Sequence, residues 1–562
     1  MSNNCHLTLM KRAIKISILF FLGIILFIIA MIGLCIATSN IEEPSTTLPT
    51  IRGEKVSEKD GYRSIGNNWI RQSETGLWEV YVEGSDIERG VALGKLEKEL
   101  MFYQEKVFVD QINELVPSKS YVNFLKHLIV FYNRNLTDYI PQEYQNEIYG
   151  TTIEGTHEFD YIGTPYERQL NYHAAHDLGH AMQDYMLVGC TSFATWGDCS
   201  KDTLLTIGRN FDFYMGDDFA KNKVVTFYNP EHGHKFAMVG WAGMTGVLSG
   251  MNEEGLTVTI NAAKSDMPTS SAMPISLLAR KILQYASTID EAFAIADSAQ
   301  TFVSESILIG SANDKRAAII EKSTEKTALY APKGNSIVCA NHYQSETFAN
   351  DERNVENIQT SDSPYRQKRA EQLLKEKYPI DPQKAAEILR DTRGMDGENI
   401  GLGNEKALNQ LIGHHSVVFQ PEKGLMWVST SHWQLGRFVA YDLKKIFNEA
   451  NPSEEIYTKE MEIKEDSLIN TAEFRNFLGY RHTKKAIRKS LSEKRNLSNK
   501  EIRNLTLLNP NLFEAYDIAG DAFWAKGEKD SANVYWSKAL LLEIPKLGEK
   551  EKIEKKIEKS IR

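Results

Sequence analysis

The sequence predicts an α+β fold in which two antiparallel sheets carry helices on their outer sides. Three observations support this prediction. Residues 76–189 place apolar side chains at mostly helical spacing. After Cys190 the chain changes to short apolar segments separated by glycine turns, which are typical of strands. Two helical stretches then divide these strands into an early and a late group.

Each expected element follows from its own pattern. "RGVALGKLEKELMFYQEKVFVDQINELV" and "YERQLNYHAAHDLGHAMQDYMLV" have the helical spacing of the first part. "MNEEGLTVTI" predicts a hairpin, because a glycine turn separates two apolar runs. The expected strands are 203–213, 223–229, 235–243, 246–263, 304–331, 336–344, 415–431 and 436–443, and the expected helices among them are 274–299 and 363–378.

The N-terminal part predicts a membrane anchor. Residues 16–38 hold no charge and would form a helix of about 35 Å, enough for a hydrocarbon core of about 30 Å. Lys11, Arg12 and Lys15 precede this run, so we expect residues 1–39 to start in the cytoplasm and the remaining chain to lie outside it. A cleaved signal peptide is the alternative, although its apolar region is usually shorter.

The segments that flank the central part are expected to be accessory. Residues 40–75 are polar, with two prolines, and predict a tether. Residues 449–500 predict a charged helical linker, and 501–562 a helical segment. Within it, residues 509–545 resemble one tetratricopeptide repeat, which could bind a protein partner. The repeat positions are Tyr516, Ala519, Gly520, Phe523, Ala532, Trp536, Ala539 and Pro545.

Composition excludes some classes of function. The chain has 562 residues and a formal net charge of −10, without the concentrated basic patch that nucleic-acid binding needs. Its five cysteines are too few for a disulfide framework over this length.

Cys190, in "GCTSFA", has two interpretations. Most free cysteines are small buried hydrophobic residues. A nucleophilic cysteine needs a nearby base, and its own α-amine, with a pKa near 7.7–8.0, would serve if the chain were cut between Gly189 and Cys190.

The motifs "GCTSFA", "GRNFDF", "NEEGLTVTINAA", "ANHY" and "SPYRQKRAEQLL" favour the second interpretation, because in this order they resemble those of cysteine N-terminal-nucleophile hydrolases. The sequence is most similar to the acyl-coenzyme A:isopenicillin-N acyltransferase family, with choloylglycine hydrolases more distant. The resemblance covers roughly residues 85–445. It implies a four-layer αββα sandwich over 190–448, a precursor that cuts itself, a small subunit from 76–189 that stays bound, and no cofactor.

The resemblance also implies roles for individual residues. Cys190 would be the nucleophile, and Arg209 would lower the pKa of its thiol. Asp212 would accept a hydrogen bond from the new α-amine of Cys190. Read singly, Arg209 and Asp212 could equally form a surface ion pair.

Three further residues would complete the site. Asn261 and Asn341 would donate hydrogen bonds to the oxyanion of the tetrahedral intermediate. Arg366 would complete the polar network, with Arg369 as the alternate candidate. The alternative is that the two asparagines are a turn residue and a strand-end cap.

A second cluster, "HAAHDLGH", places His173, His176 and His180 along one helical face, where they could bind zinc. The zinc-protease pattern His-Glu-x-x-His is absent, and a polar helix face packed on the catalytic domain is the simpler interpretation.

The predicted function is a membrane-anchored, extracytoplasmic amidohydrolase or acyltransferase for small N-acyl substrates. Whether water or an amine receives the acyl group is open. The alternatives are a membrane-anchored binding module with a degenerate catalytic domain, and a metal-dependent hydrolase that uses the three histidines.

Overall fold

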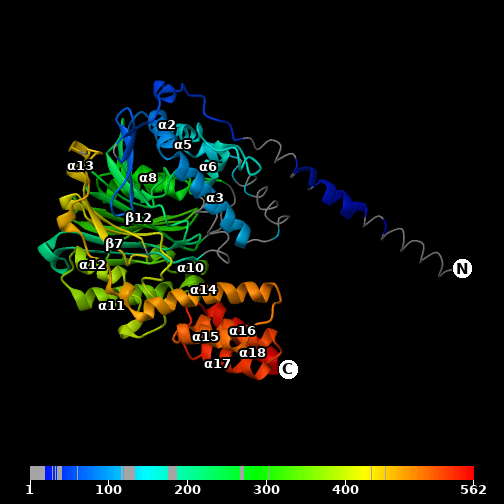
Figure 1. The fold of residues 1–562 in the computed structure, drawn as a ribbon. Helices are drawn as coiled ribbons and strands as arrows, with labels where there is room; N and C mark the ends of the chain where they lie inside the picture. The colour runs from blue at the N-terminus through cyan, green and yellow to red at the C-terminus, as the bar shows by residue number, and fades with distance from the viewer. Residues whose placement is uncertain are drawn as a thin grey trace.

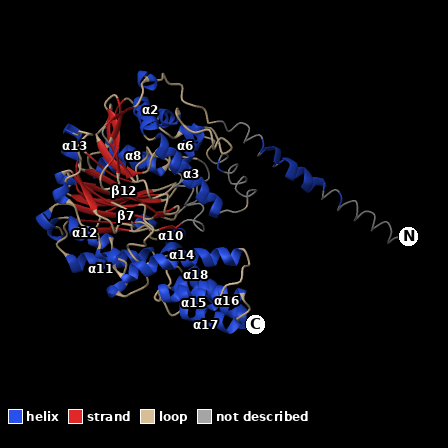
Figure 2. Cartoon of the chain, in the orientation of Figure 1, coloured by secondary structure: helices blue, strands red, loops and turns tan. Residues whose placement is uncertain are grey.

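Two large sheets lie face to face with helices outside them in the computed structural model (Figures 1 and 2). The structure describes residues 41–561, apart from 60, 116–117, 119–128, 130–132, 134, 175–186, 266–270, 302, 432 and 450, and also describes 15, 19–27, 29–31 and 33. The predicted α+β sandwich is confirmed.

The first sheet has eleven strands, in the order β1-β2-β3-β4-β9-β10-β11-β12-β13-β14-β15. Every neighbouring pair is antiparallel except β4 and β9. The strands are β1 (Ser57–Lys59), β2 (Tyr62–Ile65), β3 (Asn68–Gln72), β4 (Trp78–Gly84), β9 (Val224–Pro230), β10 (Phe236–Gly240), β11 (Ser249–Asn252), β12 (Leu256–Ala262), β13 (Glu305–Ser311), β14 (Arg316–Lys322) and β15 (Thr327–Tyr330).

The second sheet has six strands, in the order β16-β6-β7-β17-β18-β19. A separate two-stranded pair, β5 with β8, lies at the edge of the Cys190 region. The bounds are β5 (Leu187–Val188), β6 (Thr191–Thr195), β7 (Thr206–Phe211), β8 (Phe213–Tyr214), β16 (Ser336–Cys339), β17 (His415–Gln420), β18 (Leu425–Ser429) and β19 (Phe438–Asp442).

Alternation along the strands divides the core into layers. In β13, Leu308 packs between the sheets, while Ile307 and Ile309 pack outward against helices. In β17, Val417 faces the inner core and Val418 faces the outer helices. Both faces are therefore buried, which explains why the strands appear as nearly continuous apolar runs in the sequence.

Each sheet has its own helical cover, which completes the four layers. Helices α8 (Ile275–Tyr285) and α9 (Ile289–Ser298) pack on the first sheet. Helices α11 (Ser363–Lys377) and α12 (Pro382–Leu389) pack on the second. The remaining helices of this part are α10 (Glu352–Thr360) and α13 (Leu443–Glu449).

The segment before Cys190 is more than the expected tether and helices. It supplies β1 to β4, and then α2 (Asp86–Leu96), α3 (Lys98–Leu115), α5 (Gln142–Thr152) and α6 (Pro165–His173). We expected residues 40–75 to form a tether, but they contain β1, β2 and β3. Ile65, Trp69 and Ile70 of this segment are buried. Polar composition between these residues hid the alternating pattern.

The parallel pairing of β4 with β9 joins the chain before Cys190 to the chain after it. Seven residue pairs are in register, from Trp78 opposite Val224 to Gly84 opposite Pro230. The first part of the chain thus supplies β1 to β4, the consecutive strands at one end of the large sheet.

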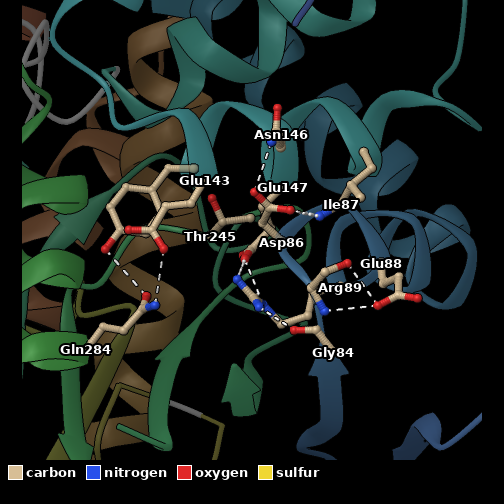
Figure 3. A network of polar contacts seen from close by, with 12 residues as sticks. Gly84, Asp86, Ile87, Glu88, Arg89, Glu143, Asn146, Glu147, Thr245 and Gln284 are labelled. Carbon is tan, nitrogen blue, oxygen red and sulfur yellow. Dashed lines mark hydrogen bonds and ion pairs between the residues drawn. The ribbon is translucent and has the colours of Figure 1, made fainter. Parts of the chain in front are cut away.

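A buried ion cluster crosses the same boundary (Figure 3). Glu147 of α5 accepts hydrogen bonds from Arg89 of α2 at 2.7 and 2.9 Å and from Arg280 of α8 at 2.9 and 3.0 Å. All three side chains are at most 2 % exposed. Burial opposes ionisation of Glu147, but the charges of Arg280 and Arg89 hold its pKa below the usual value.

Helices α2 and α5 approach closely enough to form this cluster because glycines lie between them. A Cβ on Gly90 would lie 2.2 Å from the carbonyl oxygen of Glu147. A Cβ on Gly94 would lie 2.5 Å from the carbonyl oxygen of Thr151. Any larger residue at either position would push the two helices apart.

The C-terminal part is a helical bundle that packs below the sandwich in Figure 1. Its core includes Leu411 and Trp433 of the sandwich, together with Phe474, Phe477 and Phe513. The bundle consists of α14 (Ala472–Ser492), α15 (Asn499–Leu508), α16 (Phe513–Ala525), α17 (Lys529–Ala539) and α18 (Leu547–Ile561).

Two helices, α16 and α17, form the pair expected for residues 509–545. Gly520 faces Trp536, and a Cβ at Gly520 would lie 2.4 Å from the indole. The tetratricopeptide assignment and its protein partner stay predictions.

The predicted membrane anchor over residues 16–38 is wrong. No helix of the described residues is long and apolar enough to cross a membrane. The membrane attachment and the extracytoplasmic localisation inferred from that run lose their basis with it.

We expect Glu147→Gln to lower the free energy of unfolding by about 3–5 kcal/mol, because two buried guanidinium groups would lose their counter-charge. Urea denaturation followed by circular dichroism measures this change. Asp110→Asn is the control, since Asp110 forms an exposed pair with Lys106 and its loss should cost less than about 1 kcal/mol. Equal effects of the two substitutions would contradict the prediction.

Candidate active site

Cys190 lies between β5 and β6, at the point where the chain enters the second sheet. Its side chain is completely buried, and its thiol is free. The backbone N–H of Gly189 donates to the carbonyl oxygen of Asp212 at 3.1 Å, which fixes the peptide that precedes Cys190.

Arg209 is the cation nearest to the thiol. Strand β7 pairs with β6 so that Arg209 lies opposite Ser192, and its Nη2 donates to Cys190 Sγ at 3.7 Å. Burial raises the pKa of Cys190 to about 11, while the Arg209 charge and a hydrogen bond from the Asp212 backbone lower it. In the intact chain the thiol is therefore protonated at neutral pH.

Asp212 is a buried carboxyl without a hydrogen-bond partner. Neither of its side-chain oxygens is bonded within the part of the chain that the structure describes, and its exposed fraction is 0 %. Burial raises its pKa to about 7, against the opposing charges of Arg366 and Arg209. The Gln434 amide lies close enough to affect this pKa but does not reach hydrogen-bond geometry.

An unpaired buried carboxyl is costly and calls for an explanation. The resemblance predicts that the α-amine of Cys190 would bind Asp212. In the intact chain that nitrogen is a peptide amide, so the unsatisfied state of Asp212 agrees with a site whose amine has not yet formed.

Arg366, on α11, contacts the Cys190 peptide from the other side. Its Nη1 donates to the carbonyl oxygen of Cys190 at 2.7 Å and to Thr191 Oγ1 at 2.9 Å. Its Nη2 donates to Asn341 Oδ1 at 2.8 Å. The alternate candidate, Arg369, instead forms a bidentate pair with Asp391. Arg366 is therefore the arginine that the fold brings to Cys190.

The two predicted oxyanion donors are engaged elsewhere. Asn261 Nδ2 donates to the carbonyl oxygens of Cys339 and Ala340, and Asn341 Nδ2 donates to that of Ala262. These bonds tie β12 of the first sheet to the end of β16 in the second. Their role as oxyanion donors stays a prediction.

Three polar residues that the sequence did not single out hold Arg209 in place. Ser249 Oγ accepts from Arg209 Nη1 at 2.6 Å and lies 2.8 Å from His415 Nε2. His415 Nδ1 lies 2.9 Å from His414 Nδ1. Burial lowers the pKa of His414 to about 3 and that of His415 well below its usual value, so both rings are neutral. The sequence around His414 and His415 has no motif that would predict their position beside Arg209.

Gln410 is a further residue that the sequence did not single out. Its Nε2 donates to the carbonyl oxygen of Gly189 at 3.0 Å. The carbonyl of the Gly189–Cys190 peptide thus already has a donor in the intact chain.

A small cavity of about 40 Å³ lies beside Phe213, one residue after Asp212. Its walls are mainly apolar. They include Met101, Phe108, Tyr172, Phe213, Phe219, Trp241 and Met244.

The histidine cluster is only partly described. His173 is buried, with Nδ1 bonded to the carbonyl oxygen of Gln169 and Nε2 accepting from the N–H and hydroxyl of Thr245. Both ring nitrogens are occupied by the fold, which suits a packed histidine better than a metal ligand. Burial lowers its pKa to about 4. His176 and His180 lie outside the described residues.

Residues 199–430 match the family model of acyl-coenzyme A:6-aminopenicillanic acid acyl-transferase. The resemblance that the sequence predicts is therefore confirmed over this range. The match contains Arg209, Asp212 and Arg366 and begins after Cys190.

Curated relatives match about half of the chain. An uncharacterized protein of Archaeoglobus fulgidus is 24% identical over 296 residues, which are 49% of this chain and 47% of that protein. Protein dcd1B of Dictyostelium discoideum is 22% identical over 281 residues, 45% of this chain and 51% of that one. The chain thus spans about half the length of these curated relatives.

Two solved structures are similar at low identity. An N-acylethanolamine-hydrolyzing acid amidase ortholog of Caenorhabditis elegans is 18% identical, with a TM-score of 0.30, over 42% of this chain and 93% of that one. A mutant of the conjugated bile acid hydrolase from Clostridium perfringens is 14% identical, with a TM-score of 0.30, over 48% of this chain and 95% of that one.

We expect Asp212→Asn to remove a pH-dependent loss of stability in uncleaved Cys190→Ala protein. The pKa of Asp212 is raised from 3.8 to about 7, so its contribution is favourable below about pH 4 and is lost as pH rises through 7. Three pKa units at about 1.4 kcal/mol each give up to about 4 kcal/mol.

Urea denaturation at pH 4, 6 and 8 measures this difference. The stability of the Asn variant relative to its parent should rise across that range. Asp218→Asn, at an exposed carboxyl, should leave the pH profile unchanged. A constant difference between parent and Asp212→Asn would contradict the prediction.

Proposed function

We propose that the chain is a cysteine N-terminal-nucleophile amidohydrolase or acyltransferase that cuts itself between Gly189 and Cys190. The mature enzyme would act on linear amide bonds of small N-acyl substrates. One observation supports this proposal above the others: three buried groups converge on the Cys190 peptide. Arg209 reaches the sulfur and Arg366 binds the carbonyl of Cys190, while the Asp212 carboxyl has no hydrogen-bond partner among the described residues.

In the proposed cleavage, Cys190 Sγ attacks the carbonyl carbon of Gly189. The C–S bond forms, the C–N bond breaks, and the thiol proton is transferred to the departing nitrogen. Water then adds to the thioester, which gives a Gly189 carboxylate and regenerates the thiol. The overall reaction consumes one water and needs no cofactor.

Cleavage changes the electrostatics of the site. Cys190 gains an α-amine with an ordinary pKa near 7.7–8.0, which can accept the thiol proton. The Asp212 carboxyl would bind and orient this amine. Arg209 would stabilise the thiolate, because an opposite charge at this distance favours the ionised form.

In the proposed turnover, the thiolate attacks a substrate amide and forms an acyl-enzyme. The departing amine takes the proton held by the Cys190 α-amine. Water or a second amine then releases the acyl group. The cavity beside Phe213 is lined mainly by apolar side chains, with Gln104, Glu105, Gln169 and His173 as its polar lining, and so could receive an acyl group.

We expect purified protein to yield a fragment that begins Cys-Thr-Ser-Phe, while Cys190→Ala remains whole. Intact-mass analysis with N-terminal sequencing measures both. A wild-type chain that stays whole, or a variant cut at the same bond, would contradict self-cleavage by Cys190.

We also expect the two fragments to remain together. Seven register pairs between β4 and β9 and the ions around Glu147 cross the cut. The fragments should co-elute in size-exclusion chromatography and separate only on a denaturing gel. Glu147→Gln should lower the urea concentration at which they dissociate. Separate elution of the fragments without denaturant would contradict this expectation.

A further inference from the structure

We infer that Gln410 is the oxyanion donor for cleavage of the Gly189–Cys190 bond, and so a catalytic residue of maturation. This inference rests on the proposed function and adds a residue to it. Its basis is the position of the Gln410 amide on the carbonyl that would react.

The contact between Gln410 and the Gly189 carbonyl is direct and buried. Gln410 Nε2 lies 3.0 Å from the carbonyl oxygen of Gly189, and the side chain is 2 % exposed. Oxyanion donors act at about 2.7–3.1 Å from the position that the charged oxygen takes in the transition state, and the Gln410 amide already lies on this oxygen in the ground state. Because this oxygen becomes the oxyanion when Sγ adds to the carbonyl carbon, the donor is in place before the reaction begins.

The same contact explains the glycine before Cys190. A Cβ at position 189 would lie 2.2 Å from Gln410 Nε2 and 2.8 Å from its Oε1. A side chain at this position would therefore displace the donor or the peptide. Glycine leaves the space in which the amide can reach the carbonyl.

The loop that carries Gln410 is held from several sides. Asn210 Nδ2 donates to the carbonyl oxygens of Leu389 and Leu408, and Asn409 Nδ2 donates to that of Trp433. Leu411 has a φ of 55°, a conformation that a bulky residue adopts only when its surroundings enforce it. Such strained residues cluster at functional sites.

The inferred donor differs from the two predicted for turnover. The side-chain amides of Asn261 and Asn341 donate to backbone carbonyls in the intact chain. Gln410 instead donates to the carbonyl of the bond that breaks. Cleavage and turnover would therefore use different donors at the same nucleophile.

The test follows cleavage of the full chain made by cell-free synthesis with a radioactive label. Wild type, Gln410→Glu and Gln410→Met are compared by the rate at which full-length chain disappears. Met has a similar size but no donor, and Glu adds a charge that opposes the oxyanion. Gln145→Glu is the control, because the Gln145 amide donates to the carbonyl oxygens of Thr137 and Ile140, in the part of the chain that precedes Cys190.

We expect both Gln410 variants to cleave about 10²-fold more slowly, the cost of losing one oxyanion donor. Gln145→Glu should cleave at the wild-type rate. Thermal melting of each variant in the uncleavable Cys190→Ala protein shows whether the fold is kept, and slow cleavage with an unchanged melting temperature supports the inference.

Two other results would overturn it. Wild-type rates in folded Gln410→Met would show that the amide is not needed, with self-cleavage itself intact. If both Gln410 variants cleave slowly and also melt at a clearly lower temperature, the residue would have a packing role. Wild type that never cleaves would overturn the proposed function as well, so the two failures are distinguishable.

Discussion

The parallel pairing of β4 with β9 is the constraint on which the rest of the structure depends. It places the chain before Cys190 inside the same sheet as the chain after it. Helices α2 and α5 then pack over that sheet, and Glu147 receives both Arg89 and Arg280. The segment before Cys190 is therefore a structural part of the sandwich, and the Gly189–Cys190 peptide lies in its interior.

Burial of that peptide determines the electrostatics of the site. The thiol and Asp212 both lose solvent, so their uncharged forms are favoured in the intact chain. Arg209 from strand β7 and Arg366 from helix α11 oppose this effect with their charges. The site thus holds two arginines, and a carboxyl without a hydrogen-bond partner among the described residues, around a thiol that is still protonated.

The elements that could be predicted from the sequence are those that a local pattern of residues marks. Strands and helices after Cys190, and the arginine at position 366, were accessible because each belongs to a periodic or motif-like segment. Gln410 was not, since it lies 221 residues from Gly189 and its segment has no distinguishing pattern. The strands at 57–84 were hidden because polar residues stand between their buried apolar residues. The anchor was predicted from the uncharged run over residues 16–38 and the basic residues before it, but no helix of the described residues is long and apolar enough to cross a membrane.

The C-terminal bundle also sets an order of events during synthesis. Leu411 and Trp433, which flank and hold the Gln410 loop, pack in one core with helices that end at Ile561. These helices are synthesised after the Gln410 loop. A nascent chain that already contains Gly189 and Cys190 therefore lacks the packing that fixes Gln410. The arrangement around the Gly189 carbonyl that the structure shows forms only after the helices through Ile561 have been synthesised.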